Sequence, residues 1–217
     1  MSRVERYLIG IIVGILCPAT LFILFWWTSA ALLIFGILPL PNEAIVVSSF
    51  IGLILGILLD IRYLKSWVDK FYTLDARLLA IFYIFWSAAA LGLFMGLPIG
   101  NLIWGTLAGV YVGRRGFHAQ SEESDLRNNA KYVGILTASL TGIESLVIGL
   151  LALQDAFLLE TVEAITRTEP GSLSGSTGVI FALIVGFIIA ILQFTLTYYT
   201  ALFAYRLRGG ELQKQHV

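Results

Sequence analysis

The stretch Tyr132–Leu153, YVGILTASLTGIESLVIGLLAL, holds a single charged residue, Glu144, in a run long enough to cross a lipid bilayer. A helix rises ~1.5 Å per residue, so about 20 apolar residues match the ~30 Å hydrocarbon core. A helix on the surface of a soluble protein carries a charged face, which this stretch lacks. The stretch therefore predicts a transmembrane helix.

Comparable runs recur along the chain. Apolar residues make up 58% of the 217 residues and charged residues 13%, whereas soluble domains have about 45–50% and about 25%. We therefore predict an all-α integral membrane protein of the cell membrane, with residues 1–217 forming one polytopic domain of about six transmembrane helices. The predicted spans are residues 7–29, 42–59, 78–94, 97–113, 132–153 and 178–205. Ala30–Leu38 either extends the first span or lies in the outer leaflet.

The distribution of basic residues sets the predicted orientation. The chain has 14 Lys and Arg residues, and this map places all of them except Arg167 on one side of the membrane. Lys and Arg accumulate in cytoplasmic segments of membrane proteins. Both termini are therefore predicted to be cytoplasmic. The net charge of zero gives no indication of nucleic-acid binding.

Two connecting segments have interpretable patterns. In residues 60–75, apolar residues recur at helical spacing, and polar and charged residues occupy the other face. This pattern predicts an amphipathic helix in the cytoplasmic membrane interface between spans two and three. Residues 154–177 form the predicted extracytoplasmic segment. It carries four carboxylates against Arg167, and such an acidic mouth would raise the local concentration of cations. Its first half continues the helical period, either as an extension of the fifth span or as a short separate helix.

Glycines recur at four-residue spacing within several spans, as in Gly52–Gly56 and Gly105–Gly109–Gly113. Small residues at this interval let membrane helices approach closely. The pattern predicts a tight bundle, a homo-oligomer, or a subunit that packs into a larger membrane complex.

Glu144 is the only ionisable residue deep inside any predicted span. A charged carboxylate there costs at least ~2.5 kcal/mol on insertion scales, so it is a functional-site hypothesis by default. Glu144, Asn101 and Gln193 each lie thirteen residues from the basic residue at the inner end of their span. These basic residues are Lys131, Arg114 and Arg206, respectively. Thr141 and Thr197 share the helix faces of Glu144 and Gln193. We therefore predict a solute- or proton-binding site of these five residues, the alternative being hydrogen bonds that only hold the helices together.

The sequence lacks several functional motifs. It has no phosphate-binding glycine loop, no paired-cysteine or His-Glu-x-x-His metal site and no intramembrane histidine, so neither a metal nor a cofactor is expected. No stretch is specific enough to indicate a family. Three hypotheses remain open: a small transporter or channel-like protein for a small solute or cation, proton-coupled through Glu144; a non-catalytic subunit of a membrane complex; and an enzyme acting on lipid headgroups at the cytoplasmic face.

Overall fold

The structure is a computed structural model that describes residues 1–38, 41–94, 96, 98–169, 171 and 175–207. Within these residues all the regular secondary structure is helical, without strands. Five of the helices are long and apolar enough to cross a membrane. The all-α membrane class predicted from the sequence is confirmed to this extent. Of the basic residues used to predict the orientation, Arg208 and Lys214 lie outside the described residues.

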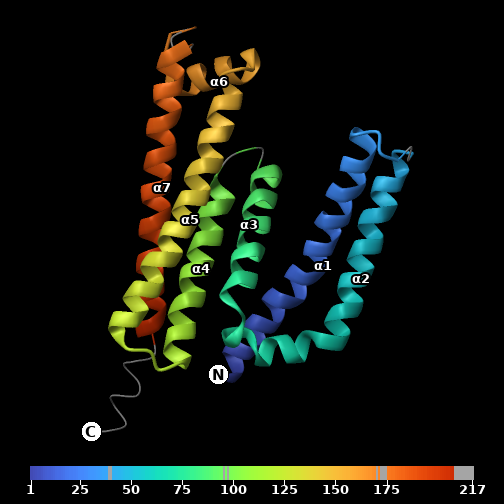
Figure 1. Cartoon of the computed structure of the whole chain (residues 1–217), viewed down its shortest axis with the longest axis vertical. Helices are drawn as coiled ribbons and strands as arrows, with labels where there is room; N and C mark the ends of the chain where they lie inside the picture. Colours follow the sequence, from blue (N-terminus) through green and yellow to red (C-terminus); the bar gives the residue numbers. More distant parts are fainter. Residues whose placement is uncertain (39–40, 95, 97, 170, 172–174, 208–217) are drawn as a thin grey trace. The chain divides into compact units, whose positions relative to one another are not determined.

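The chain divides into two compact units, residues 1–75 and 76–217, where the sequence predicted one domain. The first unit holds three helical elements: α1 (Arg3–Ile34), α2 (Glu43–Asp69) and the 3-10 turn η1 (Phe71–Thr73). The second holds five, drawn from green to red in Figure 1: α3 (Ala76–Leu93), α4 (Ile99–His118), α5 (Glu123–Ala152), α6 (Ala156–Thr166) and α7 (Gly175–Arg206).

The first unit is a hairpin in which α1 and α2 pack closely along one face (Figure 1). The contact depends on two glycines of α2. A Cβ atom on Gly52 would overlap the carbonyl of Leu21, and one on Gly56 would overlap the backbone of Pro18. The predicted role of this glycine pair in close helix approach is therefore met within the chain. The helix α1 also continues to Ile34, so residues 30–34 extend the first predicted span.

The interfacial helix predicted for residues 60–75 is in part a continuation of α2. The sequence map ended the second span at Leu59, but α2 runs from Glu43 to Asp69 because neither Gly nor Pro interrupts residues 57–69. Figure 1 shows that the later part of α2 bends sharply away from the earlier part. The Tyr72 hydroxyl donates to Glu5 at 2.8 Å, which ties this end of the unit to the start of α1.

In the second unit, α4 and α5 both pack along α7 (Figure 1). A Cβ atom on Gly109 of α4 would overlap the carbonyl oxygen of Thr197. On α5, the glycines at 142 and 149 face Ala190 and Ala182 of α7. The three helices therefore approach one another at positions where at least one partner has no side chain, as membrane helices do.

The second unit reverses the polarity pattern of a soluble protein. Its fully buried side chains include Asn101, Thr141 and Gln193, each 0% exposed, whereas Phe187 and Phe203 are 67% and 63% exposed. In water this arrangement would expose a large apolar surface and bury polar groups. In a bilayer, lipid covers the apolar surface, and the polar groups face neighbouring helices.

The helix α4, which matches the fourth predicted span at 97–113, is not among the five apolar candidates. Its buried residues are small or polar: Gly100, Asn101, Gly105, Gly109 and Gly113. Its mean hydropathy is lowered by these residues and by Arg114 and Arg115 near its end. The helix packs against α3, α5 and α7, and the fourth span remains a prediction.

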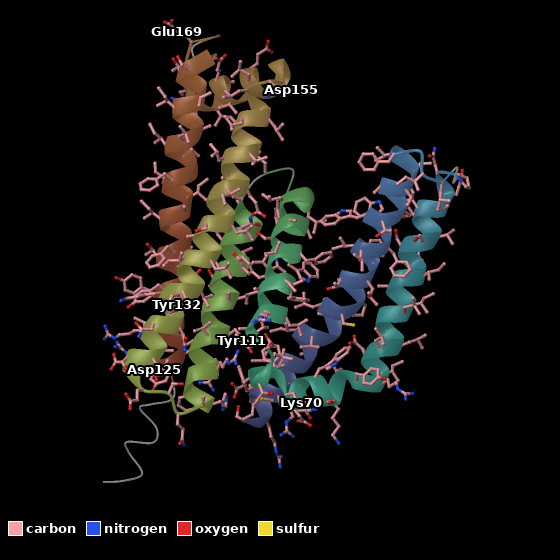
Figure 2. All side chains as sticks on the ribbon, viewed as in Figure 1. Lys70, Tyr111, Asp125, Tyr132, Asp155 and Glu169 are labelled. Carbon is pink, nitrogen blue, oxygen red and sulfur yellow. The ribbon has the colours of Figure 1, made fainter. Side chains whose placement is uncertain are left out.

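The two ends of the second unit differ in charge. At one end, Glu123 pairs with Arg127 at 2.7 Å and with Arg206 at 3.4 Å, which joins the start of α5 to the end of α7. At the other end α6 follows α5 as a separate short helix, one of the two arrangements expected for residues 154–166. Figure 2 shows Asp155 and Glu169 at the α6 end and Asp125 at the opposite end. Part of the predicted loop after α6 lies outside the described residues.

We predict that Gly109→Ala destabilises the second unit by about 1–3 kcal/mol, because the added methyl group overlaps the α7 backbone. The matched control is Gly186→Ala, where the nearest atom to an added Cβ is the Gly142 carbonyl oxygen at 3.5 Å. This control should leave stability unchanged or raise it by up to about 1 kcal/mol through helix propensity. Unfolding of the two purified variants in mixed micelles provides the comparison, and equal effects would contradict the proposed close contact.

Candidate functional site

The carboxyl group of Glu144 is hydrogen-bonded to side chains from two other helices. Its Oε2 atom accepts from the Ser87 hydroxyl of α3 at 2.8 Å and from the Asn101 side-chain amide of α4 at 2.5 Å. Ser87 and Asn101 are fully buried, and Glu144 itself is half-buried on α5. The residue predicted as the centre of the site therefore joins three helices of the second unit.

Several polar atoms around this carboxyl have no hydrogen-bond partner among the described residues. They include the Asn101 Oδ1 and the Ser145 hydroxyl. The Tyr83 hydroxyl lies within hydrogen-bonding reach of the Thr141 hydroxyl, and Tyr83 also interacts electrostatically with Glu144. Buried polar atoms without partners are costly in a helical bundle. Such a group is expected to bind a proton, a water molecule or a polar ligand.

A second polar cluster lies beside the first, between α4, α5 and α7. The hydroxyls of Thr137 and Thr197 are 3.0 Å apart, and the Gln193 side-chain amide donates to Thr197 at 3.5 Å. All three side chains are at most 1% exposed. The Gln193 amide occupies the space that a side chain at Gly105 would fill. Its Oε1 atom has no partner among the described residues.

The five predicted site residues therefore separate into two groups. Asn101 bonds Glu144 directly and Thr141 lies nearby, whereas Gln193 and Thr197 belong to the second cluster. Asn101 and Glu144, which were predicted to lie at a similar depth, are hydrogen-bonded to each other.

Gln193 is level with Thr137 rather than with Glu144, and the reason is the register of α7. Arg206 pairs with Glu123 and therefore lies level with Glu123 on α5. The depth of Glu144 was instead counted from Lys131, which lies further along the same helix. Thirteen residues from that ion pair reach Gln193 on α7 and position 136 on α5. The prediction assumed that Arg206 and Lys131 lie at the same depth, and this assumption was wrong. The count of thirteen residues was not.

Ser87 and Tyr83 were missed by the sequence analysis. Both lie in α3 one turn apart, and both are buried. A serine in a membrane span is common and carries no specific signal, and tyrosine is ordinarily assigned to membrane interfaces. The i, i+4 spacing of two hydroxyl groups in α3 is the one signal that would have identified them.

No cation balances the Glu144 carboxyl in the described part of the chain. The ion pairs found there involve other acids, and no group of three or more His, Cys, Asp or Glu side chains is placed to hold a metal. A protonated Glu144 could donate from Oε1, and the unpartnered Oδ1 of Asn101 belongs to the same amide that donates to Oε2. An acid and an amide can form two hydrogen bonds in this way. The surroundings therefore suit a neutral carboxylic acid.

The first unit holds a buried carboxyl that the sequence analysis had assigned to the cytoplasmic segment. Asp60 is only 9% exposed, and its carboxyl lies beside Gly14 and Cys17, both within the predicted first span. Glu144 is thus not the only acidic residue packed against a predicted span. The error follows from ending the second span at Leu59.

Comparison with known protein families, curated proteins and solved structures finds no match to this chain. The function must therefore be inferred from the geometry of the chain itself.

We predict that Ser87 and Glu144 are energetically coupled. Ser87→Ala should lower the free energy of unfolding by about 0.6 kcal/mol and by no more than about 1.7 kcal/mol, the range of hydrogen bonds between membrane helices. In a Glu144→Ala background the same substitution should have almost no effect, because the acceptor has been removed. A double-mutant cycle measured by unfolding in mixed micelles tests this, and additive effects would contradict the hydrogen bond.

Proposed function

We propose that this chain is a small membrane transporter or channel-like protein for a small solute or cation, in which Glu144 binds and releases a proton. The observation that carries the proposal is the Glu144 carboxyl, bonded by Ser87 and Asn101 and surrounded by polar atoms without partners. A purely structural hydrogen-bond network would be expected to satisfy its members. This one leaves an acceptor and a hydroxyl open beside an acidic group.

The proposal includes six spans, with α4 as the fourth and both termini in the cytoplasm. The length of α4, 20 residues, suits a bilayer crossing. With this orientation the basic residues around Glu123 face the cytoplasm, and the α6 end faces outward. The exposed carboxylates of Asp155 and Glu160 would then attract cations to the outer entrance.

The two alternatives gain less support from the contacts. For a non-catalytic subunit, the glycine face of α4 was expected to dock a partner, and α7 covers that face within the chain at Gly105, Gly109 and Gly113. For an enzyme acting on lipid headgroups, no catalytic arrangement of side chains at the cytoplasmic end supports the reaction among the residues that the structure describes. The native mass of the protein in a lipid-preserving detergent distinguishes a homomer from a stoichiometric subunit.

Transport can be tested in proteoliposomes that contain a pH-sensitive dye. We expect that a gradient of Na⁺ or K⁺, or a pH gradient alone, changes the internal pH faster than in empty liposomes. Glu144→Gln should reduce this rate to that of empty liposomes, because an amide cannot exchange the proton. Glu122→Gln, which alters an exposed carboxyl at the start of α5, is the matched control and should retain transport.

Equal rates for Glu144→Gln and the unsubstituted protein would rule out a proton-carrying role for Glu144. A variant that fails to fold would also lose transport. Each variant should therefore first show the elution profile and thermal transition of the unsubstituted protein.

A further inference from the structure

Asp60 lies on the face of α2 that packs against α1. The buried residues of α2 include Ser49, Gly52, Gly56 and Asp60, spaced three or four apart on one side of the helix. The carboxyl Oδ2 of Asp60 lies about 4.0 Å from where a side chain on Gly14 would begin. The Oδ1 atom is buried and has no hydrogen-bond partner among the described residues. An acidic side chain is thus enclosed between two apolar helices.

A proline in α1 supplies a hydrogen-bond acceptor at this place. Pro18 lies inside the helix, and because proline has no backbone N–H, the carbonyl of residue 14 loses its usual donor. Pro18 packs directly on Gly56, one turn before Asp60. Gly14, whose carbonyl lacks its helical donor, and the Asp60 carboxyl thus face each other across the contact between α1 and α2.

The charged and titratable groups around Asp60 come from both helices. From α1, the Cys17 thiol adjoins the carboxyl and donates to the Gly56 carbonyl at 3.7 Å. From α2, Arg62 and Lys65 line the same open groove of about 450 Å³ as Asp60, and both are exposed. Neither forms an ion pair with Asp60 in the described residues. The groove connects the carboxyl to the surroundings of the helix pair.

We propose that Asp60 is a second proton-binding group of this protein, which exchanges protons through the groove lined by Arg62 and Lys65. In the protonated state its hydroxyl donates to the Gly14 carbonyl that Pro18 leaves without a donor. On deprotonation the proton leaves to water, and the two basic side chains at the groove stabilise the carboxylate. The proposal concerns the first unit alone and does not depend on Glu144.

The lining of the groove favours a proton over a metal cation. Apart from Asp60 and its two basic neighbours, the lining residues are Gly14, Pro18, Ile57, Ile61 and Leu64. Hard cations such as Ca²⁺ and Mg²⁺ require about six oxygen ligands, and this site offers a carboxylate and carbonyl groups only. A proton requires one acceptor, a role that we assign to the Gly14 carbonyl.

The test is infrared difference spectroscopy on the full chain in lipid, recorded between about pH 6 and pH 10, above the range in which ordinary carboxyl groups titrate. The experiment uses the Glu144→Gln protein, so that Glu144 contributes no signal. We expect a carboxylic-acid C=O band that disappears as the pH rises. Asp60→Asn in the same background should abolish this band. A band that persists after Asp60→Asn, or no pH-dependent band before it, overturns the proposal.

A second variant tests the geometry without removing the carboxyl. Pro18→Ala restores an N–H donor for the Gly14 carbonyl and so weakens its bond to protonated Asp60. The Asp60 band should then shift to higher frequency. Pro98→Ala, at the start of α4, is the matched control and should leave the band in place. An unchanged band in Pro18→Ala overturns the assignment of the acceptor, even where Asp60→Asn fails to fold.

Discussion

The second unit depends on the close approach of α4, α5 and α7. Inside the hydrocarbon core, the hydrophobic effect does not drive helices together, because lipid tails are as apolar as the side chains. Association therefore relies on packing and on hydrogen bonds between helices. Glycines such as Gly109 and Gly142 bring the helix backbones together. Only at this separation can short side chains such as Thr137 and Thr197 reach each other across the interface. The polar site is therefore a consequence of the glycine contacts.

The Glu144 carboxyl connects helices through hydrogen bonds and not through close glycine contacts. Its hydrogen bonds to Ser87 and Asn101 connect α5 with α3 and α4, and α3 has few other attachments in the second unit, since it packs mainly on α4. A change in the protonation of Glu144 would alter the donor and acceptor pattern at this junction. The carboxyl is thus placed where a proton could influence how the helices contact one another.

The sequence predicted the helical membrane class because long apolar runs have few alternatives. It also predicted a similar depth for Asn101 and Glu144, whose side chains are hydrogen-bonded in the structure. It failed where helix ends had to be assumed: the register of Gln193 depends on the Glu123–Arg206 pair, which joins residues far apart in the sequence. It misplaced Asp60 because hydropathy marks a span boundary at the first acid. The spacing of Gly52, Gly56 and Asp60 on one helix face would have been the better guide.

Proton exchange by Glu144 within the bundle, as proposed above, can be tested directly by chemical modification. A hydrophobic carbodiimide reacts with protonated carboxyl groups in a membrane. Applied to the full chain in lipid and located by mass spectrometry, it should modify Glu144, at a rate that falls as the pH is raised. No modification of Glu144 at any pH, or a rate independent of pH, would contradict the account.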